Sequence, residues 1–297
     1  MRHGMGAVAI CLALVCGCCP AQSHKPLRVF ISVDLEGVAG VVDPVQLGPS
    51  GFEYERARHL MTGEANAAVA GALDAGATEI VVSDGHGNGL SILPEELNPK
   101  AQLIRAWPRP LGMMDGIDRG FDAALLIGYH PSVGTPGGLL AHTISSSVFF
   151  DVRLNGEHAS EAMISAADAG EFGVPVVLVS GGNEMVAEVH RTIDPAIIGV
   201  VVKRDIGFHS AESLSPQEAQ TNIRAATTNA LEHLSAVRPY RIPTPVSLEL
   251  TFKNIGNAEL FSYLPGVERE NGSTIKFVGK DMVQTRKFLS FVSEVAH

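Results

Sequence analysis

Short apolar runs rich in Val and Ile alternate with longer helical patterns between residue 27 and about residue 202. The runs are Val29–Val33, Ile80–Ser83, Gln102–Ile104, Ala123–Ile127, Val148–Leu154, Val174–Val179 and Gly199–Val202. Most lack polar alternation, which is typical of strands that are covered on both faces. Strands that alternate with helices pair in parallel through right-handed crossovers. The pattern therefore predicts an α/β fold with a mostly parallel sheet and helices on both faces.

Helical periodicity fills the gaps between these strands. Apolar residues recur at helical spacing over Ala57–Ala75, where Gly76 ends the pattern, and again over Ala159–Gly170. A third helix is predicted over Pro216–Leu234, with Ser215 as its N-cap and the proline at its first position.

A group of three prolines marks a boundary near residue 239. They are Pro239, Pro243 and Pro245. The sequence after them predicts two strands and a closing helix, at Val246–Phe252, Thr274–Val278 and Asp281–Val295. We therefore expect a catalytic α/β domain over residues 27–238 and a small C-terminal α+β subdomain over residues 239–297.

The first two dozen residues are typical of an export signal. The apolar stretch Ala7–Cys19 follows a short basic start and is too short to span a bilayer. Ala21 offers a cleavage site, whereas Val15–Cys18 would be a lipobox that leaves Cys18 lipidated. The alternative is a buried apolar N-terminal helix. We expect a signal peptide over residues 1–22 and an exported protein, either periplasmic or secreted, with a lipid anchor at Cys18 if the lipobox is used.

Cysteine usage and net charge restrict the chemistry. The four cysteines all lie in the predicted signal: Cys11, Cys16, Cys18 and Cys19. A mature chain would therefore lack disulfides, thiol nucleophiles and thiolate ligands, so oxygen and nitrogen must hold any metal. The formal net charge of −10 argues against a nucleic-acid partner or an anionic membrane surface. No second apolar segment is long enough to span a membrane.

Polar clusters follow three of the predicted strands. Asp34 and Glu36 follow the first strand, His86 follows the second, and His130 follows the strand at Ala123–Ile127. Residues two apart in a strand point to one face, and ligands bind at the carboxyl ends of strands in open α/β sheets. Carboxylate and imidazole together suit zinc, and also manganese or cobalt. The set is large enough for two adjacent metals.

Each residue has a simpler interpretation when it is taken alone. Asp34 and Glu36 could be a solvated strand end, His86 an exposed residue of a flexible turn, and His130 a hydrogen-bonded core histidine. His142 lies on a glycine-rich loop near the same edge, which suits proton transfer or transition-state stabilisation, or simply a surface position. Asp84 is a candidate acceptor that would fix the tautomer of His86.

Two glutamates on predicted helices have contrasting positions. Glu161 lies opposite the apolar stripe of its helix, and sequence alone favours solvent as its environment. Glu64 lies on an apolar stripe and needs a partner if it is buried, which could be the metal site or an arginine such as Arg58.

Several separated motifs together resemble those of the M55 peptidases, a family of D-aminopeptidases. They are Ser32–Gly37, Ser83–Gly87, Gly128–His130, Ala141–Thr143, and Asn155-Gly156 with Glu161. The resemblance covers roughly residues 28–235. It implies a two-zinc aminopeptidase that releases N-terminal D-residues, such as D-Ala, from short peptides. It also implies assembly into a ring-like homo-oligomer.

The resemblance also implies roles for individual residues. The metal ligands would be Asp34, Glu36, His86, His130 and Glu161, with Asp34 as the bridge, and His142 would be catalytic. Two Zn²⁺ ions would then hold a hydroxide that attacks the scissile carbonyl. The chain has Gly85 where the family usually has Ser, and Gly182-Asn183 where it usually has Asp-Asp. The alternatives are a binuclear amidohydrolase acting on a non-peptide amide, and a non-catalytic exported protein that binds peptide or metal.

Overall fold

The computed structural model describes residues 1, 3, 4 and 26–296. The predicted signal peptide, its cleavage site and the lipidation of Cys18 lie outside these residues and stay predictions. In the part that the structure does describe, none of the helices combines the length and the apolar character that a membrane crossing requires.

A sheet of seven strands forms the centre of the fold, in the order β3-β2-β1-β4-β7-β8-β9. Its strands are β1 (Leu27–Val33), β2 (Ala77–Asp84), β3 (Ala101–Ile104), β4 (Ala123–Tyr129), β7 (Val176–Gly182), β8 (Ile198–Gly207) and β9 (Ser210–Ser213). All neighbouring pairs are parallel except β8 with β9. The predicted mostly parallel sheet is therefore confirmed, with an antiparallel strand added at one edge.

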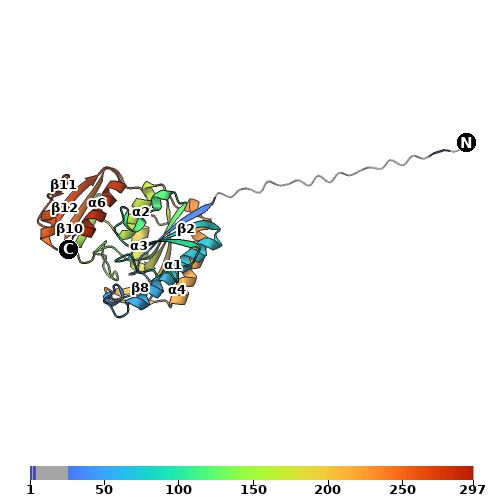
Figure 1. The fold of residues 1–297 in the computed structure, drawn as a ribbon, viewed down its shortest axis with the longest axis horizontal. Helices are drawn as coiled ribbons and strands as arrows, with labels where there is room; N and C mark the ends of the chain where they lie inside the picture. The colour runs from blue at the N-terminus through green and yellow to red at the C-terminus, as the bar shows by residue number, and fades with distance from the viewer. Residues whose placement is uncertain (2, 5–25, 297) are drawn as a thin grey trace.

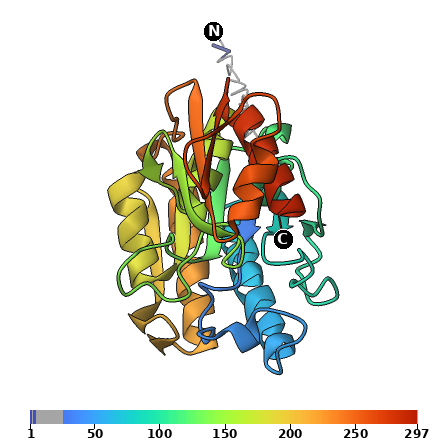
Figure 2. The ribbon, with the colours of Figure 1, turned by 90° about the vertical axis from the view of Figure 1, so that its left-hand side faces the viewer.

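Helices cover both faces of this sheet. On one face α1 (Tyr54–Asp74) packs against α4 (Pro216–Glu232), as the cyan and orange helices in Figure 2 show. On the other face lie α2 (Glu161–Glu171) and α3 (Asn183–Thr192), of which the sequence had predicted only α2. The Ser215 hydroxyl accepts a hydrogen bond from the Glu218 amide and caps α4 as predicted. Residues 26–296 also form short 3-10 helices, at Pro44–Gln46, Gly112–Met114, Ile117–Arg119 and Leu234–Ala236.

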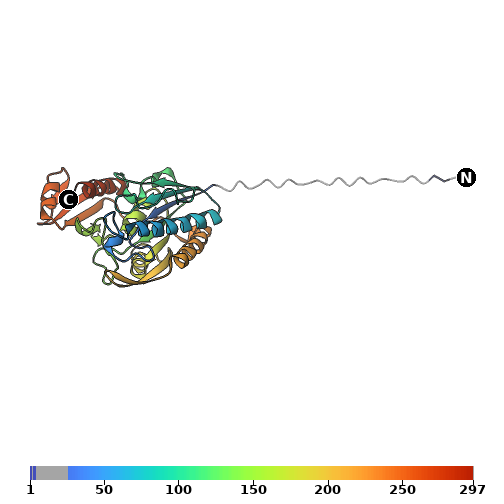
Figure 3. The ribbon, with the colours of Figure 1, turned by 60° about the horizontal axis from the view of Figure 1, so that its bottom comes forward.

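A second, antiparallel sheet lies beside one end of the first, as Figures 1 and 3 show. Its order is β11-β12-β10-β5-β6. The elements are β5 (Phe149–Leu154), β6 (Glu157–His158), β10 (Val246–Phe252), α5 (Ile255–Phe261), β11 (Val267–Arg269), β12 (Thr274–Gly279) and α6 (Met282–Val295). The helix α6 packs against β10, β12 and α2, so it joins the two layers.

The position of β5 corrects the sequence prediction. Val148–Leu154 was expected among the strands of the parallel sheet, but β5 pairs antiparallel with β10, with Leu154 opposite Leu248. Asp151 and Arg153 alternate with the buried Val152 and Leu154, which is typical of a strand covered on one face. The second sheet therefore takes strands from both sides of residue 239.

Candidate metal centre

Six polar side chains converge at the carboxyl ends of β1, β2 and β4. Asp34 and Glu36 follow β1, His86 follows β2, His130 follows β4, His142 lies on the loop before β5, and Glu161 is the first residue of α2. The side chain of His142 is 14% exposed, and the other five are at most 6% exposed. The structure thus brings together all six residues that the sequence had marked as site candidates.

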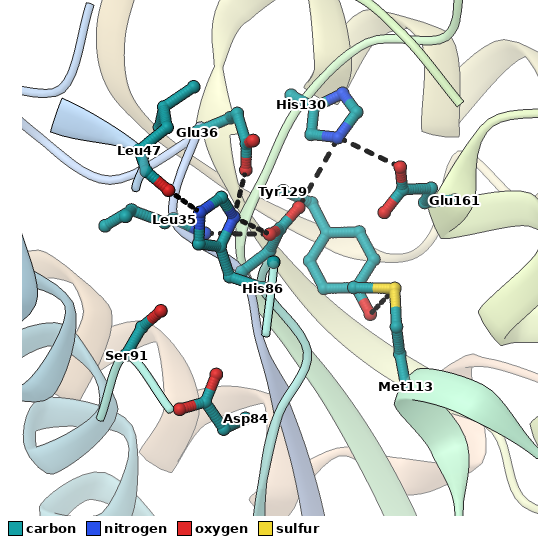
Figure 4. A network of polar contacts seen from close by, with 12 residues as sticks. Leu35, Glu36, Leu47, Asp84, His86, Ser91, Met113, Tyr129, His130 and Glu161 are labelled. Carbon is teal, nitrogen blue, oxygen red and sulfur yellow. Dashed lines mark hydrogen bonds and ion pairs between the residues drawn. The ribbon is translucent and has the colours of Figure 1, made fainter. Parts of the chain in front are cut away.

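Asp34, Glu36 and His86 form what we call the first half-site. The Nδ1 atom of His86 lies 2.9 Å from Glu36 Oε2 and 3.3 Å from Asp34 Oδ1 (Figure 4). The other ring nitrogen, Nε2, lies 2.7 Å from the carbonyl oxygen of Leu47. A carbonyl oxygen can only accept, so Nε2 carries a hydrogen and Nδ1 is the nitrogen presented to the carboxylates.

His130, His142 and Glu161 form the second half-site. His130 Nε2 lies 3.2 Å from Glu161 Oε1, and its Nδ1 donates to the Pro131 carbonyl at 2.9 Å. The ring of His142 stacks on that of His130 with centroids 4.0 Å apart. Its Nδ1 donates to the Leu140 carbonyl at 2.8 Å, so its Nε2 faces the site.

Asp34 connects the two half-sites. Its Oδ1 faces His86, whereas its Oδ2 lies 3.4 Å from Nε2 of His130. Oδ2 and that Nε2 are both buried, and neither has a hydrogen-bond partner among the residues described. Buried polar atoms without partners are costly unless a ligand or ion satisfies them. Carboxylates and imidazoles are zinc donors, and the carbonyl contacts of His86 and His130 leave the other nitrogen of each ring facing the site. The three carboxylates and two imidazoles therefore fit a pair of zinc ions.

The charges in the site depend strongly on one another. Burial and the negative charge of Glu36 raise the pKa of Asp34 to about 7. Burial would also raise the pKa of Glu161, but His130 and His142 outweigh it and lower that pKa to about 2. Burial and the charge of His130 lower the pKa of His142, which favours a neutral imidazole there. A cation between the carboxylates would relieve their mutual repulsion.

Lys203 and Glu64 hold the backbone that carries the first half-site. The Nζ atom of Lys203, a buried residue of β8, donates to the carbonyls of Glu36, Val38 and Val41 at 2.5–3.0 Å. Glu64 Oε1 accepts from the amide of Ala39 at 2.8 Å. The partner of the buried Glu64 is therefore the backbone of the loop that follows β1.

The pairing of Glu64 with Arg58 that the sequence had suggested is wrong. Arg58 donates instead to Glu55 and to the carbonyl of Ser91. The importance of Lys203 was missed, although a lysine inside an apolar strand pattern was the available signal.

Asp84 does not orient His86. Its Oδ2 accepts from the amide of Ile92 at 2.7 Å, and Figure 4 shows its carboxylate next to Ser91 and apart from the His86 ring. The Leu47 carbonyl, not Asp84, accepts from the His86 ring and fixes its tautomer. Leu47 lies on a loop that no short-range sequence pattern connects with β2. Asp84 instead orders the loop that follows β2.

Two glycines set the distance between the ends of β1 and β4. A Cβ atom at Gly37 would lie 2.0 Å from the carbonyl oxygen of Tyr129, and one at Gly128 would lie 2.3 Å from that of Asp34. The amide of Gly37 donates to the Gly128 carbonyl at 2.7 Å. Gly37 therefore lets the backbone that follows β1 approach the end of the neighbouring strand.

Glu161 corrects a second prediction. Sequence alone placed it in solvent, yet it is 5% exposed, and its Oε1 accepts from the amide of Ile144 at 2.7 Å. Ile164 and Asp168 share its helix face and are also buried. A helical wheel cannot reveal this burial, because Glu161 contacts the loop at Ile144, Ile164 packs into the core of the second sheet, and Asp168 pairs with Arg286 of α6.

The loop that carries His142 has unusual backbone geometry. Leu140 and Ile144 both adopt the left-handed region, with φ of 53° and 66°. Such a conformation is uncommon for non-glycine residues and is concentrated at functional sites. The Leu140 amide donates to the Phe208 carbonyl, and that of Ile144 donates to Glu161, so both ends of the loop are held.

Comparisons with known proteins agree with this geometry. A family model described as D-aminopeptidase, of the M55 peptidases, matches residues 27–291. A D-aminopeptidase of Bacillus subtilis (strain 168) is 33% identical over 274 residues, which cover 91% of this chain and 98% of that protein. A solved structure described as the Zn-dependent D-aminopeptidase DppA from Bacillus subtilis, a self-compartmentalizing protease, superposes with a TM-score of 0.86. It is 32% identical and aligns over 91% of this chain and 97% of its own.

Proposed function

Because the chain belongs to the M55 family of D-aminopeptidases, we propose that it hydrolyses the first peptide bond of short peptides that begin with a D-residue such as D-Ala. One observation carries the two-metal form of this proposal. The two oxygens of Asp34 face different half-sites, towards His86 on one side and His130 on the other. A carboxylate placed in this way suits a bridge between two ions.

The remaining ligands divide between the half-sites. Glu36 and His86 would hold one zinc ion, His130 and Glu161 the other, and Asp34 both. When bound, the two ions would polarise the scissile carbonyl and lower the pKa of a water molecule that attacks it. The buried carboxylates would keep the centre close to charge balance, and the surrounding strand ends would exclude bulk water.

His142 is placed to move a proton. Its Nε2 lies 4.0 Å from Glu36 Oε1 and 3.8 Å from Glu161 Oε1, between the two half-sites. Its Nδ1 hydrogen is committed to Leu140, so Nε2 is free to accept a proton as water attacks. The same nitrogen can then deliver that proton to the leaving amine. His142 is also close enough to His130 and Glu161 for the three side chains to bind one metal ion together. The zinc content of a His142 variant distinguishes metal binding from proton transfer.

The proposal also covers the oligomeric assembly and the cellular location of the enzyme. The Bacillus subtilis structure is described as self-compartmentalizing, which supports a ring-like homo-oligomer for this chain. Light scattering coupled to gel filtration would test that assembly. Export rests on residues 1–22 and would place the enzyme among peptides shed from cell wall. Mass spectrometry of the mature N-terminus would distinguish cleavage after Ala21 from lipidation at Cys18.

Metal analysis combined with a chromogenic substrate tests the activity. Purified protein should contain about two zinc ions per chain. It should release p-nitroaniline from D-Ala-p-nitroanilide and leave L-Ala-p-nitroanilide largely intact. A chelator should abolish turnover, and zinc should restore it. Metal without turnover, or turnover that ignores the chelator, would contradict the proposal.

A further inference from the structure

A cavity of about 270 Å³ adjoins the second half-site. Glu161 forms part of its wall, together with Trp107, Arg109 and Ser145, and α6 contributes Arg286 and Ser290. The volume is slightly below the range of about 300–1,000 Å³ that is usual for ligand pockets. The cavity can therefore take only a small molecule beside the reacting centre.

Arg286 is the unusual residue in this cavity. It is 4% exposed, its Nε has no hydrogen-bond partner within residues 26–296, and its contact with Asp168 Oδ2 is long at 3.3 Å. A Cβ atom at Gly112 would lie 1.5 Å from Nη2 of Arg286, so the guanidinium occupies space that only a glycine leaves open. A buried guanidinium with so few partners is costly unless an anion completes its hydrogen bonds.

Arg109 adds a second positive charge to the cavity. It is 6% exposed, lies over the Trp107 ring at 3.6 Å, and donates to Ser83 Oγ and to the Asp84 carbonyl. These bonds fix Arg109 as part of the wall, while its Nε, like that of Arg286, has no hydrogen-bond partner among residues 26–296. Of the acidic side chains nearby, Asp84 accepts from the Ile92 amide through Oδ2 and Glu161 accepts from the Ile144 amide, whereas Glu294 of α6 also lines the cavity. The carboxylate oxygens of Asp168 have no hydrogen-bond partner among residues 26–296.

The distance from the metal centre matches a short peptide. Asp168, the partner of Arg286, is seven residues after Glu161 on α2, or about 10 Å along the helix axis. An extended peptide spans at most about 3.5 Å per residue. Two residues follow the first peptide bond of a tripeptide and span about 7 Å, and a hydrogen bond adds about 3 Å. The carboxyl end of a tripeptide can therefore reach Arg286 while its first peptide bond lies beside Glu161.

We propose that Arg286, with Arg109 beside it, binds the free C-terminal carboxylate of tripeptide substrates and selects them over longer peptides. This inference rests on the proposed function, because it takes Glu161 as the mark of where the bond is cleaved. Guanidinium and carboxylate form paired, charge-assisted hydrogen bonds, so the contact selects a free acid over a neutral amide.

The test compares the tripeptide D-Ala-D-Ala-D-Ala with its C-terminal amide. In the unmodified enzyme, kcat/KM for the acid should exceed that for the amide at least about tenfold, mainly through KM, which corresponds to one charge-assisted hydrogen bond. In Arg286→Gln the ratio should approach 1, and Arg286→Lys should recover part of it. Lys287→Gln removes an exposed positive charge from the same helix and should keep the full ratio.

A double variant guards against misfolding. Arg286→Gln leaves Asp168 buried without its partner, so Asp168→Asn combined with Arg286→Gln keeps the pair neutral. If this folded double variant still prefers the acid tenfold, or if the unmodified enzyme shows no preference, the inference is wrong.

Calorimetry keeps the inference separate from the proposed function. If D-Ala-p-nitroanilide is hydrolysed but acid and amide are equal, the carboxylate site fails and the peptidase proposal stands. If no substrate is hydrolysed, calorimetry of the binding of D-Ala-D-Ala-D-Ala and of its amide still tests the carboxylate site. Tenfold tighter binding of the acid, lost in the double variant, would support the site, and equal binding would overturn it.

Discussion

The two half-sites are chemically alike but are built in different ways. The first half-site stands on the ends of two adjacent parallel strands, β1 and β2, and its backbone is fixed by Lys203 of β8 and Glu64 of α1. The second half-site takes His130 from β4, but His142 and Glu161 come from a loop and a helix that flank the β5–β6 hairpin of the second sheet. The first half-site therefore depends on the main sheet and on α1, and the second depends on how the second sheet packs against the main one.

Asp34 should give the largest effect, because it belongs to both half-sites. Asp34→Ala should reduce the zinc content of the protein to near zero and lower kcat/KM about 10⁴-fold or more, as expected for groups that act as a unit. Glu161→Gln serves as the comparison and should empty only the second half-site. Elemental analysis measures the zinc content of both variants, and turnover of D-Ala-p-nitroanilide measures their kcat/KM. An Asp34→Ala protein that keeps two zinc ions would show that the half-sites are independent.

His142 should affect turnover without affecting metal. His142→Ala should lower kcat by about 10² to 10⁴, the usual contribution of a proton-transfer group, with zinc content unchanged. His158→Ala is the matched control, since His158 is an exposed histidine on β6. Loss of one zinc ion from His142→Ala would make this residue a ligand of the second half-site instead.

Lys203 should affect the first half-site alone. Lys203→Met removes three hydrogen bonds from a buried cation and leaves the loop carbonyls unpaired, which should cost about 3 kcal/mol of unfolding free energy. It should also weaken zinc binding in the first half-site by about 10- to 100-fold, as loss of ligand support does. Urea unfolding and competition with a chelator measure these changes. The exposed Lys100→Met should change neither, and an equal loss in both variants would refute the role of Lys203.

Glu64 should give the smallest effect, a pH dependence of stability. Burial raises its pKa to about 7 from an ordinary value of 4.5. The folded chain therefore keeps a proton that the unfolded chain releases between these values, and the unfolding free energy should fall as pH rises through this window. In Glu64→Gln this contribution is absent, so its stability relative to the unmodified protein should rise by about 1 kcal/mol per pH unit.

Urea unfolding of both proteins at pH 5 and pH 7, with a chelator present, isolates the contribution of Glu64. The other site residues titrate in both proteins and cancel in the difference. A constant difference between the two proteins would mean that Glu64 is ionised throughout this range.

The contrast between the half-sites also explains what sequence could reveal. Asp34, Glu36, His86 and His130 could be placed together because each follows a strand of one parallel sheet, and such strands end at one edge. Glu161 could be assigned only by family resemblance, because its contacts are with His130 and with the loop that carries His142 and Ile144, which a helical wheel does not show. The left-handed backbone at Leu140 and Ile144 has no sequence signal, since neither residue favours it.

The strands also divide into those that local sequence reveals and those that depend on a distant partner. Strands buried on both faces, such as β1 and β4, were recognised from local composition. The assignment of β5 to the wrong sheet arose because its partner β10 lies about ninety residues downstream, and pairing across such a separation has no local pattern. Alternation of Asp151 and Arg153 with apolar residues was the available signal.

The contact between Gly37 and Gly128 has an evolutionary consequence. Main-chain atoms meet directly there, so the separation of Asp34 from the end of β4 does not depend on the size of any side chain. Core substitutions that shift α1 or α4 would leave this separation almost unchanged. Most interior positions can therefore accept substitutions while the geometry of the site is retained. Gly37 and Gly128 cannot, because a methyl group at either one would push the half-sites apart.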